Sequence, residues 1–232
     1  MGALSSLAFA GDIYLSDTYT NYNPGANGGQ LTVTLDGNTN NYGVVEFNAT
    51  RTAPGGSTNL LPGVGYNFNM YCVDFGDTIA QGGNYYPSVT DLLGSTTISN
   101  GPTVFFDATR TDRMDRLWGS YYSSVVDGYT STAFQVAQWE IAFDNDMNLG
   151  TGTFSVQGYP GDPVDAGELA LAQSWLNNIS SGGANQSASL VLLSGANIQD
   201  QITLKPVPEP SSFLALGVGA VSLMSLRRRK RA

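Results

Sequence analysis

The sequence contains no histidine and only one cysteine in 232 residues. The absence of histidine excludes Ser/His/Asp and Cys/His hydrolases, histidine-ligated zinc and histidine-based acid–base catalysis. A single cysteine excludes an internal disulfide and any metal site built from several cysteines. We therefore predict no cofactor, no metal and no ordinary hydrolytic enzyme.

Charged residues are also scarce. They make up 12% of the chain, whereas glycine occurs 28 times and aromatic residues account for 11%. This composition is typical of secreted β-rich surface proteins rather than of helical cytosolic enzymes. The net charge is −9 although a basic run occupies residues 227–231, so the rest of the chain is more acidic still. Because an acidic body repels phosphate backbones, nucleic acid is not an expected partner.

An uncharged apolar segment, residues 213–226, directly precedes the basic run. Apolar residues followed by clustered arginines are typical of a membrane segment with its positive end in the cytoplasm. The segment is shorter than the roughly 20 residues that span a bilayer comfortably. We nevertheless predict a single C-terminal helix in the inner membrane, with the acidic body on the far side.

Two prolines upstream of this segment end any preceding helix or strand and leave an extended spacer. The order of parts resembles the PEP-CTERM sorting signal of Gram-negative, exopolysaccharide-forming bacteria. The matching residues are Pro208, Glu209 and Pro210, the apolar segment, and Arg227, Arg228 and Arg229. The resemblance implies recognition by a membrane-embedded exosortase, cleavage near Pro-Glu-Pro and transfer to the cell surface or extracellular matrix.

The first ten residues end in Ala8-Phe9-Ala10, which is similar to a signal-peptide cleavage site, but they lack the basic start and the full apolar region. We interpret residues 1–10 as the remnant of a signal peptide, with the mature chain beginning near Gly11. The alternative is a small N-terminal strand. The predicted organisation is a body over residues 11–205, followed by the sorting segment over residues 206–232.

Within the body, β-type patterns flank a helical middle. Apolar residues at helical spacing predict helices from about residue 111 to 121, from an N-cap at Ser131 or Thr132 to Ile141, and from a capping box at Asp165 and Glu168 to Ile179. Strands are predicted at 31–35, 44–47, 66–72, 189–193 and 201–204. This order predicts an α+β fold, an antiparallel β-sandwich or barrel with an inserted helical lobe.

The lone cysteine, Cys72, belongs to the third of these strands. Tyr66, Phe68 and Met70 alternate with polar residues and lead up to it. The alternation predicts that Cys72 lies on the inward face of the strand with its sulfur shielded.

Two short motifs together resemble the thioester domains of bacterial surface adhesins. One is Tyr71-Cys72 at a strand end, and the other is Gln135-x-Ala137-x-Trp139 in the second predicted helix. The family often has threonine before the glutamine and a β-branched residue before the tryptophan, where this chain has Phe134 and Gln138. The resemblance implies an internal thioester between Cys72 and Gln135 within the body.

The chemistry implied is single-turnover covalent binding and not enzymatic catalysis. A thiol is a good leaving group, so a thioester acylates an incoming amine or hydroxyl of a surface or matrix molecule. Trp139 and Tyr71 are the candidates for shielding the bond from water. Glu140 and Asp74, next to the pair in sequence, are the candidates for relaying a proton, although a structural role is also open for each.

The alternative function is a non-reactive structural or carbohydrate-binding matrix protein in which Cys72 is simply buried. Tyr85-Tyr86 and Tyr121-Tyr122 are the candidate sugar-stacking pairs, although such pairs more often serve packing. Asp144, Asp146 and Asn148 match the start of a calcium loop. Leu149 replaces its glycine and Ser155 its bidentate glutamate, so the pattern does not predict a calcium site.

Overall fold

The computed structural model describes the body of the chain. The described residues are 19–20, 30–44, 46–50, 60–61, 65–78, 86, 88–98, 100–144, 146–158, 160 and 165–206. The predicted signal-peptide remnant, the mature start near Gly11, Tyr85 and residues 207–232 lie outside them.

The described strands form two antiparallel sheets. The first has the order β1 (Tyr19–Thr20), β4 (Glu46–Thr50), β5 (Asn67–Cys72), β9 (Ile198–Leu204), β8 (Leu190–Gly195) and β6 (Ser88–Asp91). The second has the order β3 (Asn38–Gly43), β2 (Gln30–Leu35) and β7 (Phe154–Gly158). Helices α1 (Ala108–Tyr121) and α2 (Gly128–Phe143) follow β6, with a 3-10 turn (Tyr122–Ser124) directly after α1. Helix α3 (Asp165–Ser180) lies between β7 and β8 in the chain. The predicted α+β class is confirmed as two antiparallel sheets plus three helices.

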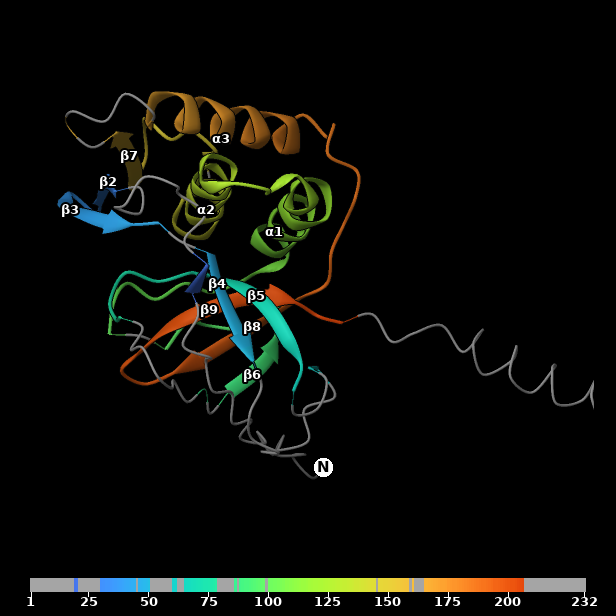
Figure 1. Ribbon diagram of the computed structural model, residues 1–232. Coiled ribbons are helices and arrows are strands. Elements are labelled where there is room, and N and C mark those ends of the chain that lie inside the picture. Colours follow the sequence, from blue (N-terminus) through green and yellow to red (C-terminus); the bar gives the residue numbers. More distant parts are fainter. Residues whose placement is uncertain are drawn as a thin grey trace, which may run out of the picture.

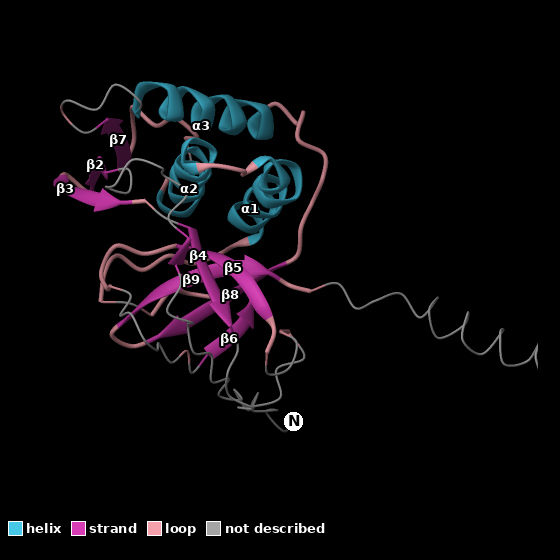
Figure 2. Ribbon diagram, in the orientation of Figure 1, coloured by secondary structure: helices cyan, strands magenta, loops and turns pink. Residues whose placement is uncertain are grey.

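The helices lie together on one side of the six-stranded sheet, and the smaller sheet lies beside α2 and α3 (Figure 1; Figure 2). Helix α2 is in contact with α1, α3 and β7. Every residue from Ser131 to Ala142 is buried. A helix surrounded in this way must satisfy the polar side chains that it carries, because unpaired buried polar groups are costly.

Helix α2 begins earlier than the sequence predicted. Its N-cap is Asp127, whose carboxylate accepts a hydrogen bond from the backbone N–H of Thr130, while the Thr130 side chain bonds the N-cap backbone in return. The predicted cap at Ser131 or Thr132 is therefore wrong, and both residues lie inside the helix. Gly128 and Tyr129 are poor helix formers, which concealed the first turn, and the capping box compensates for them.

Two hydrophobic clusters form the core. The larger one joins the helices to the sheets and contains Tyr71, Cys72 and Val73. The smaller one contains Phe68 and Met70. The predicted burial of Cys72 is confirmed, at 5% exposure. Cys72 points into the core as predicted, but it packs in the larger cluster, whereas Phe68 and Met70 pack in the smaller one. At Cys72 the strand ends, and the alternation no longer determines which cluster a side chain joins.

Strand β3 was not predicted, because its sequence is almost entirely polar and exposed. It pairs with β2 along its whole length through a tight turn at Asp36 and Gly37, both of which have positive φ. Turns of this kind match the twist of a hairpin and favour Asp-Gly. The strand therefore depends on the turn and on pairing rather than on burial.

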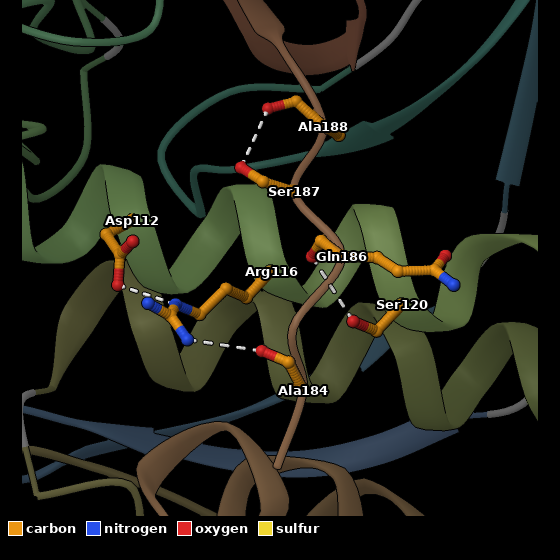
Figure 3. A network of polar contacts seen from close by, with 7 residues as sticks. All are labelled: Asp112, Arg116, Ser120, Ala184, Gln186, Ser187 and Ala188. Carbon is orange, nitrogen blue, oxygen red and sulfur yellow. Dashed lines mark hydrogen bonds and ion pairs between the residues drawn. The ribbon is translucent and has the colours of Figure 1, made fainter. Parts of the chain in front are cut away.

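The segment that links α3 to β8 runs along α1 and ties the helical layer to the sheet. Arg116 donates to the carbonyl of Ala184 and pairs with Asp112, and Ser120 donates to the carbonyl of Gln186 (Figure 3). Gly119 lies between the two helix residues that make these bonds. A Cβ placed on it would lie 2.7 Å from backbone atoms of Gln186 and Ser187.

We therefore expect Gly119→Ala to destabilise the protein by about 1–3 kcal/mol, although alanine is the better helix former. The added methyl group meets backbone that cannot move aside without breaking the bonds to α1. Urea denaturation measures the change. Ser120→Ala, which only removes one exposed hydrogen bond, serves as the control and should cost less. A stabilised Gly119→Ala variant would show that the segment does not pack as described.

Candidate functional site

The structure brings Cys72 and Gln135 into contact. The thiol of Cys72, at the end of β5, donates to Oε1 of Gln135 in α2 over 3.6 Å. The side-chain amide of Gln135 donates in turn to the backbone carbonyl of Cys72 over 2.8 Å. Gln135 is fully buried and Cys72 is 5% exposed. The two groups that the sequence paired are thus locked together by reciprocal hydrogen bonds inside the core.

The backbone of Cys72 is fixed from the sheet side. Cys72 is in register with Gln201 of β9, and the N–H of the following residue, Val73, donates to the carbonyl of Asp200. β5 lies between β4 and β9 in the sheet and is paired on both sides. The cysteine therefore sits on a rigid part of the fold.

A second glutamine completes the arrangement. Gln138 lies one turn along α2 from Gln135, on the same face, and its amide also donates to the Cys72 carbonyl, over 2.9 Å. Its Oε1 accepts from the indole N–H of Trp118 over 3.0 Å. In the sequence, Gln138 stands out only as a departure from the thioester motif. The i, i+3 spacing of the two glutamines on a buried helix was the signal that could have identified it.

Aromatic rings surround the pair. Tyr71 packs against Trp118 and Phe134, with ring centroids 5.8 and 5.1 Å away, and its hydroxyl is hydrogen-bonded to Ser131. Trp139 packs against Phe75, with ring centroids 4.6 Å apart. The rings of Tyr71 and Trp139 are buried. Both residues proposed for shielding therefore belong to the same hydrophobic cluster as Cys72.

The surroundings of Cys72 favour the neutral thiol. Burial, with a smaller contribution from the charge of Asp74, raises the pKa of Cys72 well above its ordinary value. The indole N–H of Trp139, which is buried and makes no regular hydrogen bond, opposes this rise in the pKa of Cys72. Trp139 thus offers an N–H that stabilises negative charge on the sulfur when it develops.

Asp74 and Glu140, the candidates for a proton relay, direct their carboxylates to backbone groups. Asp74 accepts from the N–H groups of Gly76, Asp77 and Asp200. Glu140 accepts from the N–H of Asn148. In the described part of the chain no hydrogen bond joins either carboxylate to Cys72 or Gln135. The relay stays a prediction, and the contacts found are structural.

Asp74 is one of two neighbouring buried carboxyls. Asp200, in β9, accepts from the N–H groups of Gly195 and Ile98. Both side chains are fully buried. Burial raises the pKa of Asp74 to about 6 and that of Asp200 to about 7, and outweighs these hydrogen bonds. The charge of Asp77 adds to the rise in both pKa values, and the charge of Asp74 adds to that of Asp200. The strand ends next to Cys72 thus carry a proton-sensitive pair.

The tyrosine pair considered for sugar stacking is used in packing. Tyr121 stacks on Trp175, with ring centroids 5.0 Å apart, and Tyr122 contacts Trp118 at 4.8 Å. Tyr86 is buried and donates to the carbonyl of Gln199. The packing interpretation therefore fits these three tyrosines.

The sorting residues Pro208, Glu209, Pro210, Arg227, Arg228 and Arg229 lie outside the described residues, as does the predicted membrane segment 213–226. Within the described part of the chain, no helix combines the length and the apolar character needed to cross a bilayer.

Comparison with known families supplies the evidence for this end of the chain. The model of the PEP-CTERM protein-sorting motif matches residues 206–230. The chain carries a PEP-CTERM sorting signal. This motif implies export and a cell-surface location through exosortase, as the sequence predicted. No curated protein and no solved structure matches the chain.

Proposed function

We propose that this exported PEP-CTERM protein forms an internal thioester between Cys72 and Gln135 and attaches through it to a surface or matrix molecule. The observation that supports the proposal most directly is the buried contact between the Cys72 thiol and Gln135 at 3.6 Å. The motif around Gln135, Ala137 and Trp139 supports it independently.

Thioester formation is a condensation within the folded chain. The sulfur of Cys72 attacks the side-chain carbonyl carbon of Gln135, the thiol proton passes to the side-chain nitrogen, and ammonia leaves. No oxidant or metal is required. Fixed proximity of two reacting groups contributes up to about 7–11 kcal/mol compared with free reactants. The N–H of Trp139 stabilises negative charge on the sulfur during the attack.

Gln138 explains how the site survives the loss of ammonia. Gln135 loses its N–H donor when the thioester forms, which removes one of the two hydrogen bonds to the Cys72 carbonyl. Gln138 keeps the second bond, and Trp118 holds Gln138 in place. The carbonyl therefore stays paired throughout, which avoids the cost of an unsatisfied buried acceptor.

Covalent attachment follows when an amine attacks the thioester. The amine forms an amide with the Gln135 carbonyl, and Cys72 recovers its proton as a free thiol. Each molecule reacts once, so the protein acts by single-turnover capture and not as an enzyme. The surrounding rings keep out water, the competing nucleophile.

The alternative is a non-reactive matrix protein, and one observation favours it. Cys72 is a buried, hydrogen-bonded thiol with a raised pKa, which are the properties of an inert structural cysteine.

Intact mass separates the two functions. We expect the full-length chain, purified from cells without exosortase, to be lighter than its sequence mass by one molecule of ammonia. Cys72→Ala and Gln135→Glu should each have the full mass of their own sequences. Gln186→Glu, at an exposed glutamine outside the site, should keep the deficit.

A wild-type chain with its full sequence mass, an intact Gln135 amide and a Cys72 that is alkylated after unfolding would exclude the thioester. Prior hydrolysis gives a different result, because it leaves a glutamate side chain where Gln135 stood. Peptide mapping distinguishes these two states.

A further inference from the structure

A second cluster of side chains lies at the opposite end of α2 from its N-cap. Glu140, in the last turn of α2, and Asp144 and Asp146, just beyond it, have carboxylate oxygens that all lie within 4.8 Å of one another. Glu140 is fully buried, Asp144 is 9% exposed, and Asp146 is exposed. The cluster therefore runs from the core to the surface.

Glu140 is the unusual member. One of its oxygens accepts from the N–H of Asn148, but the other, Oε2, is buried and has no hydrogen-bond partner. A carboxylate oxygen that is removed from water and left unpaired is costly. The neighbours of Glu140 in the cluster are two further carboxylates, which accept hydrogen bonds and supply no proton when ionised.

The neighbouring carboxylates are held in place by the loop that follows. Asp144 accepts from the N–H groups of Thr153 and Phe154, and Asp146 accepts from the N–H of Asn148 and the hydroxyl of Thr151. Oxygens positioned in this way cannot separate to relieve their repulsion. A cation between them removes both the repulsion and the unpaired oxygen.

We propose that Glu140, Asp144 and Asp146 bind one divalent cation, with calcium as the expected ion and water completing its shell. Calcium binds six to eight oxygen ligands in flexible geometry, and carboxylates are its usual protein ligands. The sequence did not predict a calcium loop here, because Leu149 replaces its glycine and Ser155 its bidentate glutamate. The structure supplies the missing acid from the preceding helix.

The location of the protein suits weak binding. The sorting signal directs the chain to the cell surface, and calcium sites of extracellular modules typically have dissociation constants of about 10⁻⁴–10⁻³ M. An ion at this place would join the end of the helix that carries Gln135 to the start of the 144–154 loop.

Calcium titration of the full-length, EDTA-treated protein tests the proposal. We expect one site by calorimetry, with a dissociation constant of about 10⁻⁴–10⁻³ M. Terbium bound at the same site should show luminescence sensitised by Trp139, the residue next to Glu140. Added calcium should displace the terbium and reduce this luminescence. Glu140→Gln and Asp146→Asn should each weaken binding at least about tenfold, because each removes a charged ligand.

Asp36→Asn provides the matched control. Asp36 is an exposed acidic residue whose backbone N–H donates a hydrogen bond to the carbonyl of Thr153. It therefore lies beside the same loop without belonging to the cluster. Its substitution should leave calcium affinity unchanged. Asp146 is exposed, so Asp146→Asn keeps the test valid if Glu140→Gln fails to fold. The absence of calcium binding, or binding that Asp146→Asn leaves unchanged, would overturn the proposal.

Discussion

A labelled primary amine incubated with the full-length protein is expected to become attached once per molecule, at Gln135. Cys72→Ala should reduce the labelling more than about 100-fold, because a thioester reacts with amines whereas a glutamine amide does not react with them unaided. Mass spectrometry of the labelled peptide locates the adduct. The same experiment should show one new free thiol, at Cys72, for each label incorporated.

The buried position of the pair predicts how labelling depends on the size of the amine. Gln135 has no exposed surface and Cys72 has little, so a nucleophile must enter between packed aromatic rings. Methylamine should therefore react faster than a bulky amine of similar basicity. Gln186→Glu is the control and should label as the wild type does. Equal labelling of wild type and Cys72→Ala, or a label at another glutamine, would rule out capture through Cys72.

The contact between Cys72 and Gln135 could be predicted because two short motifs specify it together. Neither the strand end nor the helix motif is informative alone, and periodicity does not say which helix meets which strand. The resemblance to a known arrangement supplied that link, and the structure places the side chains within hydrogen-bonding distance. The burial of Tyr71 and Trp139 followed from ordinary hydrophobic patterning.

What the sequence did not reveal depends on long-range contacts between polar groups. Gln138 looked like a mismatch because its partners, Trp118 and the Cys72 carbonyl, lie on other elements. The relay role of Glu140 was predicted from its nearness to Gln135 in the sequence alone, which does not show that its carboxylate accepts a hydrogen bond from Asn148. A residue's type predicts that it needs a partner, but only the fold determines which partner it has.

The stability of the protein is expected to fall as pH rises from about 4.5 to 8. Asp74 and Asp200 have pKa values of about 6 and about 7 when folded, above the value near 3.9 that aspartate has in unfolded chains. The folded state therefore binds more protons than the unfolded state in this range. The stabilisation is fully present below about pH 4 and is lost as pH passes through the folded pKa values.

Each unit by which a folded pKa exceeds the unfolded one corresponds to about 1.4 kcal/mol, so the pKa values of Asp74 and Asp200 correspond to a total loss of up to about 7 kcal/mol. Urea denaturation at successive pH values measures it. The chain has no histidine, so no ordinary histidine titration obscures this range. Burial also raises the pKa of Asp115 to about 6 and that of Glu140 to about 8, which adds to the same slope.

Asp200→Asn separates the buried pair from these other groups. It removes one titrating carboxyl, together with a charge that adds to the effect of burial in raising the pKa of Tyr86. We expect the variant to be less stable than the wild type at pH 5, because it loses a hydrogen bond from the N–H of Ile98 or of Gly195. Between pH 5 and 8 it should lose less further stability than the wild type does. Asp36→Asn, at an exposed site, should keep the wild-type slope. Burial and, to a smaller extent, the charge of Asp74 raise the pKa of Cys72, so ionisation of Asp74 also makes the thiolate harder to form. A stability curve that rises between pH 5 and 8, or a slope unchanged in Asp200→Asn, would mean that the two carboxyls are ionised throughout this range.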